Sequence, residues 1–133
     1  MTYTHNIKVR YAETDAMQRA HHSNYLIWLE AARIGFLDQI GLPYQDIESK
    51  GLYIPVLSAK VEYLKPASFN DTLTIQVALK ERPKVRFSFQ YEIRNKNELI
   101  AQGSTEHIFI DKLNKIIRIP SFFSQKLELL PYG

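Results

Sequence analysis

The sequence predicts an α+β domain in which a curved antiparallel sheet wraps one long helix. One long stretch has apolar residues at helical spacing, and a series of short alternating segments separated by turn residues follows it. The length of 133 residues fits a single domain, 1–133. Because one helix cannot cover both faces of a sheet, the apolar face of the strands should hold the helix.

The first element is a strand at residues 6–11. Apolar Ile7, Val9 and Tyr11 alternate there with basic residues, which is the period of a half-buried strand. A polar segment at residues 13–23 follows it, and this segment separates the strand from the helix.

The long helix is predicted at residues 23–40, about 18 residues or roughly 27 Å long. Ser23 is the expected N-cap, because its hydroxyl can accept a hydrogen bond from the first turn. Gly41, followed by Leu-Pro, is a stop signal. Apolar residues lie off the main stripe as well, so the helix should be buried on most sides. These residues are Ile27, Trp28, Ala31 and Ile34.

The remainder of the chain is predicted to be mostly strands joined by turns. The expected strands are 52–64, 72–80, 85–93, 98–110 and 115–119, with turns at 81–84, 94–97 and 111–114. A short helix is expected at 44–50 and a terminal helix at 121–130.

Composition excludes several classes of protein. The chain has no cysteine, so disulfides, a thiolate nucleophile and thiolate metal sites are absent. The formal charge of +3 is mild and its basic residues are spread out, which argues against nucleic acid as a partner and also suits a small anionic ligand. No segment is long enough for a membrane span, and the N-terminus does not have the pattern of a signal peptide, so a cytoplasmic location is expected.

No metal site is expected either. The histidines do not have the spacing that places two ligands on one face of a helix. Motifs of dinucleotide enzymes, NTPases and serine hydrolases are also missing.

The residues that point to chemistry lie between 9 and 33. Asp15 follows the first strand, and His22 lies at the start of the helix. The unpaired N–H groups of a helix start can stabilise an oxyanion, and a nearby carboxylate can attack a carbonyl or activate water. Taken alone, the pattern favours a capping or solvated Asp beside a surface His pair over a catalytic site.

Three motifs carry a resemblance to a known family. They are Tyr11-x-Glu13-Thr14-Asp15, His22-x-Asn24-Tyr25-Leu26 and Glu30-x-Ala32-Arg33. With these motifs, the chain resembles the 4-hydroxybenzoyl-CoA thioesterase family of hotdog-fold acyl-CoA thioesterases over about residues 7–119. More narrowly, it resembles the thioesterases associated with the bacterial Tol–Pal system.

The resemblance implies a hotdog fold with five to six strands and hydrolysis of an acyl-CoA thioester to a free acid and CoA. Asp15 would be the nucleophile or the general base, and the backbone N–H at His22 would polarise the thioester carbonyl. CoA would be part of the substrate, with no cofactor consumed. The resemblance also implies a homodimer or homotetramer, with the active site at the dimer interface.

The chain departs from the family pattern at Gln18, where relatives usually have a glycine that two β-branched residues often follow. Here Arg19 and Ala20 follow. Glycine is kept where φ is positive, so Gln18 must adopt a costly conformation or the loop must differ. This departure favours the alternative function, a non-catalytic hotdog dimer that binds acyl groups or a partner protein. A hotdog dehydratase is disfavoured because its local pattern is missing.

Substrate-binding candidates are fewer and weaker. Lys65 and Arg86 are the basic residues expected to reach the CoA phosphates, although a solvated strand face explains each of them equally well. Tyr25 is a candidate substrate contact, but like Trp28 it is expected mainly to pack. Glu30 and Arg33 are expected to pair on the helix.

Overall fold

The computed structural model describes residues 2–79 and 84–128. Eleven elements follow one another along this part of the chain. In order they are β1 (Thr2–Lys8), the 3₁₀ turn η1 (Tyr11–Glu13), α1 (Ser23–Gln39), α2 (Tyr44–Ser49), β2 (Val56–Tyr63), β3 (Thr72–Leu79), β4 (Phe87–Asn95), β5 (Glu98–His107), β6 (Phe109–Ile110), β7 (Ile116–Ile117) and α3 (Ser121–Glu128).

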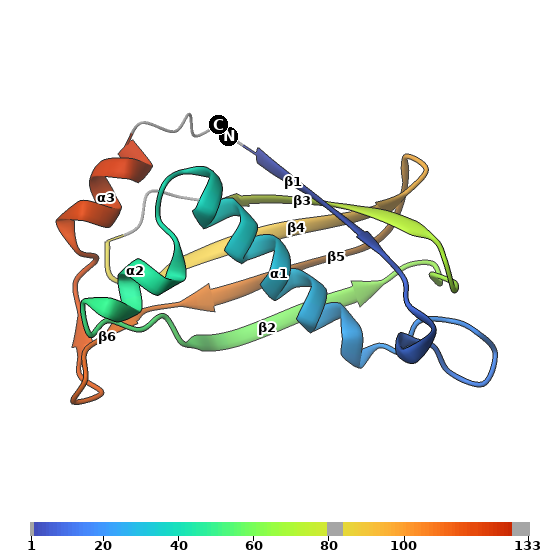
Figure 1. The fold of residues 1–133 in the computed structure, drawn as a ribbon, viewed down its shortest axis with the longest axis horizontal. Coiled ribbons are helices and arrows are strands. Elements are labelled where there is room, and N and C mark those ends of the chain that lie inside the picture. The colour runs from blue at the N-terminus through green and yellow to red at the C-terminus, as the bar shows by residue number, and fades with distance from the viewer. Residues whose placement is uncertain (1, 80–83, 129–133) are drawn as a thin grey trace.

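Five strands form one antiparallel sheet in the order β1-β3-β4-β5-β2, and α1 crosses one face of it (Figure 1). Buried and less buried residues alternate along β3 and β4, and the buried ones face the helix. Phe89 of β4, for example, packs edge-on against Phe36 of α1. The α+β prediction and the packing of the helix on the apolar face are therefore confirmed.

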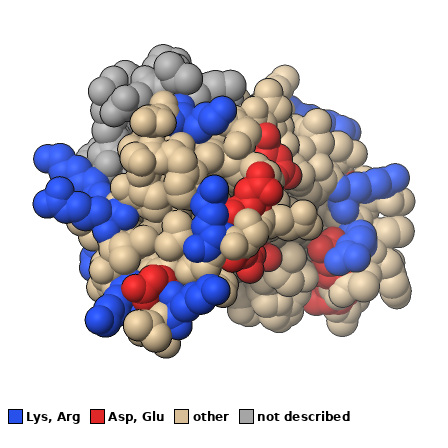
Figure 2. All heavy atoms as spheres, turned by 60° about the vertical axis from the view of Figure 1, so that its left-hand side comes forward, with Lys and Arg blue, Asp and Glu red and all other residues tan. Residues whose placement is uncertain are grey.

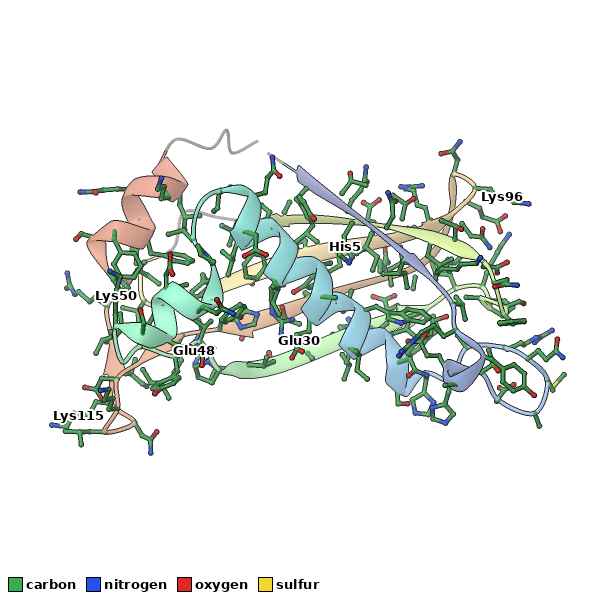
Figure 3. The ribbon with its side chains drawn as sticks, in the orientation of Figure 1. His5, Glu30, Glu48, Lys50, Lys96 and Lys115 are labelled. Atoms are coloured by element: carbon green, nitrogen blue, oxygen red, sulfur yellow. The ribbon has the colours of Figure 1, made fainter. Side chains whose placement is uncertain are left out.

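The hairpin between β4 and β5 has a clear local cause. Lys96 and Asn97 both have positive φ, at 50° and 69°, as a two-residue hairpin turn requires. They join β4 to β5, and the predicted turn at 94–97 is confirmed in shortened form. Figure 3 shows Lys96 at this hairpin tip and Lys115 at the β6–β7 hairpin, at opposite ends of the molecule.

The predicted first strand is wrong in its bounds. β1 ends at Lys8, where its partner β3 begins at Thr72, so the pairing stops there. Val9 is buried, but Tyr11 lies in η1 with 68% of its surface exposed. The earlier part of β1 was missed because its polar residues do not show an apolar alternation.

Two predictions about the long helix are wrong. Ser23 is not the N-cap; His22 holds that position, and the Ser23 hydroxyl bonds Nδ1 of His21 instead of a first-turn N–H. Nor is α1 buried on most sides within one chain, since Leu26 and Ile27 are 46% and 58% exposed. The stop at Gly41 is confirmed by its φ of 81°.

The remaining boundaries differ by a few residues. β2 begins only after Pro55, which has no N–H to donate. The β3 prediction extended to Lys80, which lies outside the described residues, as do 81–83 of the predicted turn and 129–130 of the predicted last helix. On the face that Figure 2 shows, Lys and Arg side chains form several separate groups with acidic side chains between them.

Candidate active site

Asp15 occupies the first position of a tight hairpin loop. Its backbone N–H donates to the carbonyl of Arg19 at 2.8 Å, and its carbonyl accepts from Gln18 at 2.9 Å. Its Oδ1 accepts from the backbone N–H groups of Met17, at 2.8 Å, and Arg19, at 3.2 Å. Oδ2 takes no hydrogen bond from any described residue. The loop therefore fixes the carboxylate and leaves one oxygen available.

Gln18 adopts the left-handed conformation that the sequence predicted as one of two outcomes. Its φ is 61°. In a three-residue hairpin loop, the last loop residue takes this conformation, which is why glycine suits it. The loop thus keeps its geometry with glutamine, at the cost of local backbone strain.

A second loop of the chain repeats this arrangement. Asp111 donates its N–H to the carbonyl of Lys115 at 3.0 Å, and its Oδ1 accepts from Leu113 at 2.8 Å and from Lys115 at 3.0 Å. Asn114 has φ 62°, as Gln18 does. The turn by itself therefore does not identify a catalytic carboxylate. Only the groups around Asp15 can distinguish it from Asp111.

The start of α1 lies beside Asp15 and leaves one donor unpaired. The N–H of His21 donates to the carbonyl of Glu13 at 2.8 Å, and that of Ser23 to Nδ1 of His21 at 3.2 Å. Among the described residues, no acceptor pairs with the N–H of His22. An unpaired N–H at a helix start is a ready donor for a carbonyl or an anion.

A cavity of about 370 Å³ brings these groups together. The Asp15 loop and the start of α1 form one wall, and the end of β2 with the segment that follows it forms the other. The Tyr63 hydroxyl of that second wall donates to the carbonyl of His22 at 3.2 Å. The lining residues are Asp15, Arg19, Ala20, His21, His22, Tyr25, Tyr63, Leu64, Lys65 and Pro66.

Glu13 braces the cavity from behind, a role that the sequence did not predict. It is only 5% exposed, and its carboxylate accepts from the backbone N–H of Arg10 and from the indole of Trp28, both at 2.8 Å. Burial raises the pKa of Glu13, but these donors outweigh burial and the pKa is lowered overall. The carboxylate thus joins the segment before the Asp15 loop to α1.

The structure brings together four of the five predicted site residues. Asp15, His22, Tyr25 and Lys65 all line the cavity, and Lys65 is paired with Glu98 at 2.8 Å. Tyr25 is 3% exposed, in line with its expected packing role, and burial raises its pKa.

The fifth predicted residue lies elsewhere. Arg86 precedes β4 at the end of the sheet where α2 and α3 lie, and it is 3.6 Å from Glu106. One chain therefore does not bring Arg86 to the cavity.

A network of buried polar side chains crosses the core behind the helix, and no pattern in the sequence predicted it. Arg33, 4% exposed, donates to the Tyr91 hydroxyl at 3.3 Å, and that hydroxyl lies 2.6 Å from Thr105 Oγ1. His107 Nε2 is 2.8 Å from the same Oγ1. Burial lowers the pKa of His107 to about 4, and the charge of Arg33 adds to this effect.

The expected pairing of Arg33 with Glu30 is present at 3.9 Å. Glu30 itself projects from α1 at the exposed side of the helix (Figure 3).

Within 2–79 and 84–128, no group of three or more His, Cys, Asp or Glu side chains is placed to hold a metal ion. In the same ranges, no helix has the length and apolar character that crossing a membrane requires.

Comparison with known proteins relates the chain to a family of thioesterases. Residues 9–127 match the family described as the thioesterase-like superfamily. The chain is 35% identical over 107 residues to the "Putative acyl-CoA thioesterase YneP" of Bacillus subtilis, a match that covers 80% of this chain and 78% of that protein.

Two solved structures are similar over nearly their whole length. The hypothetical protein TT1821 from Thermus thermophilus has a TM-score of 0.93 and 35% identity, with 100% of both chains covered. A DHNA-CoA thioesterase from Staphylococcus aureus has a TM-score of 0.89 and 34% identity, covering 96% of this chain and 87% of that one. These similarities confirm the predicted hotdog fold.

Proposed function

This chain belongs to the thioesterase-like superfamily, and on that premise we propose that it hydrolyses an acyl-CoA thioester to a free acid and CoA. The observation that carries the proposal is that the fixed Asp15 carboxylate and the unpaired N–H of His22 line one cavity. Relatives named as acyl-CoA and DHNA-CoA thioesterases support the reaction class.

The thioester carbonyl oxygen accepts from the N–H of His22, where the dipole of α1 also favours the developing negative charge. Asp15 then acts through its available oxygen, Oδ2. As a nucleophile, it forms a mixed anhydride and releases the CoA thiolate, and water then hydrolyses the anhydride. As a general base, it takes a proton from a water molecule that attacks the carbonyl carbon directly.

Both routes give the same products, a carboxylic acid and CoA. Lys65 is the cation of the second wall and supports binding of the substrate. CoA is part of the substrate, and no cofactor is consumed. The reaction is proposed to take place in the cytoplasm.

The test is thiol release from a panel of acyl-CoAs. Asp15→Asn retains an acceptor for the loop N–H groups but removes the carboxylate, and a loss of at least ~100-fold in kcat/KM is expected. Asp111→Asn is the matched control, because it makes the same change in the same type of turn. Equal activity of Asp15→Asn and Asp111→Asn would remove Asp15 from the mechanism.

We also propose that the active unit is a homodimer, or a tetramer of such dimers. β2 is an edge strand, and it carries, with the residue that follows it, apolar side chains that are 42–49% exposed, namely Val56, Leu57, Tyr63 and Leu64. The exposed Leu26 and Ile27 of α1 add to this surface. An unpaired apolar edge of this kind is suited to pairing with a second copy.

Antiparallel pairing of two β2 edges brings the opposite ends of the two sheets together. The cavity lies at the Tyr63 end of β2, and Arg86 lies toward the Val56 end. In such a dimer, the end of the sheet that carries Arg86 approaches the cavity of the other chain. This arrangement reconciles the predicted role of Arg86 with its distance from the cavity within one chain.

Light scattering tests the interface. Ile27→Asp is expected to give monomers with strongly reduced thiol release. Leu113→Asp, at a residue that is 75% exposed on the far hairpin, is the control and is expected to remain dimeric. A fully dimeric Ile27→Asp would place the interface elsewhere.

A further inference from the structure

We propose that Arg19 selects acyl groups that carry a second negative charge, such as the half-thioesters of dicarboxylic acids. This inference rests on the proposed function and extends it to the class of substrate. Arg19 lies in the cavity wall, four residues after Asp15, and its guanidinium is a permanent cation.

The backbone of Arg19 is fixed beside Asp15. The two residues exchange hydrogen bonds across the hairpin, and Arg19 also forms an isolated bridge with Ser68. Directly paired residues in antiparallel hairpins have Cα atoms about 5.5 Å apart. The base of the Arg19 side chain is therefore anchored next to the carboxylate that would act on the thioester.

The guanidinium of Arg19 has no acidic partner among the described residues. The six ion pairs found there involve other cations, and Arg19 does not pair with Asp15 either. Lys65, across the cavity, forms an exposed ion pair with Glu98 at 2.8 Å. Of the two cations that line the cavity, Arg19 is thus the one without an acidic partner among the described residues.

Distance decides which anion Arg19 can meet. The phosphates of CoA are separated from the thioester sulfur by about a dozen bonds of ~1.5 Å, or roughly 15 Å when extended. A residue next to Asp15 is too near the reacting carbonyl to suit them. A carboxylate a few carbons from the carbonyl on the acyl side falls within its range, and guanidinium binds carboxylates in a two-pronged geometry.

Charge balance in the cavity supports the same choice. With Asp15 ionised, an acyl group with its own carboxylate would be repelled from the site. Arg19 offsets this repulsion, whereas a neutral acyl chain would gain nothing from a cation. The cavity is therefore suited to charged acyl groups better than to purely aliphatic ones.

The test compares glutaryl-CoA with pentanoyl-CoA, which have the same number of acyl carbons and differ by the terminal carboxylate. Wild type is expected to prefer glutaryl-CoA by ~10-fold or more in kcat/KM. Arg19→Met is expected to lose at least ~10-fold on glutaryl-CoA while staying within ~3-fold on pentanoyl-CoA. Arg94→Met, at a paired arginine away from the cavity, is the matched control and should keep the wild-type preference.

Two results would overturn the inference while leaving the proposed function intact. One is a wild-type preference for pentanoyl-CoA. The other is an equal loss on both substrates in Arg19→Met, which would assign Arg19 to the CoA portion that both share. If wild type hydrolyses neither these nor any other acyl-CoA, the proposed function fails, and the inference fails with it.

Discussion

Replacing Gln18 by glycine is expected to stabilise the protein. Gln18 has φ 61°, where a side chain with a Cβ costs roughly 1–2 kcal/mol. Glycine removes that cost but adds about 0.5–1 kcal/mol of conformational entropy to the unfolded chain. The net gain in the free energy of unfolding is therefore about 0.5–1 kcal/mol, or roughly 2–4 °C in Tm for a chain of this size.

The assay is urea or thermal unfolding of wild type, Gln18→Gly and Gln18→Ala at one protein concentration, because the proposed dimer would make Tm depend on concentration. Alanine keeps the Cβ and is expected to show no gain. Asn114→Gly changes the equivalent position of the second turn and should gain less, since asparagine tolerates this conformation better than glutamine. Equal stabilities of Gln18→Gly and Gln18→Ala would refute the reasoning from backbone strain.

The other predictions concern the buried polar groups. Trp28→Phe removes the indole donor to the Glu13 carboxylate and is expected to lower the free energy of unfolding by about 1.5–3 kcal/mol, as measured in urea. Because the folded pKa of Glu13 is lowered, its contribution to stability is present above the ordinary pKa of 4.5 and is lost as pH falls through the folded value; a Glu13→Gln variant should lack this acid-dependent loss in unfolding experiments. His107 has a folded pKa of about 4 instead of 6.5, so the unfolded chain binds more protons between these values and stability falls as pH drops across that window. The full effect is roughly 3 kcal/mol at about 1.4 kcal/mol per pKa unit, and His107→Gln should flatten unfolding profiles measured from pH 6.5 to 4; an unchanged slope would show that another group titrates there.

The sequence predicted best where structure depends on neighbouring residues. Alternation in β3 and β4 indicated the buried face directly, because one side of each strand packs on α1. The glycine pattern of the family, combined with Gln18, predicted either a strained position or a different loop, and the structure has the strained position, with φ 61°. Asp15 and His22 share a cavity because the short loop between them returns to the start of the helix.

Features that depend on distant residues could not be predicted in this way. The end of β1 is set by the start of β3, far along the chain. The roles of Glu13 and His107 depend on partners far away in the sequence, namely Trp28 of α1 and the carbonyl of Pro55, which lies 3.2 Å from Nδ1 of His107. The side of α1 that carries Ile27 was predicted to be core because an apolar pattern in the sequence does not distinguish a core from an interface between chains.

The same turn occurs at Asp15 and at Asp111. Its aspartate is therefore required by the backbone conformation of the turn, whether or not it also has a catalytic role. Each loop is held by its own hydrogen bonds, so its first two inner residues can change without disturbing the aspartate that precedes them, whereas the third has a positive φ that restricts its choice. Residues 16, 17 and 19 can thus vary beside a fixed carboxylate. Related proteins can in this way acquire new substrate ranges by altering a few exposed positions, with the fold and the reacting group inherited unchanged.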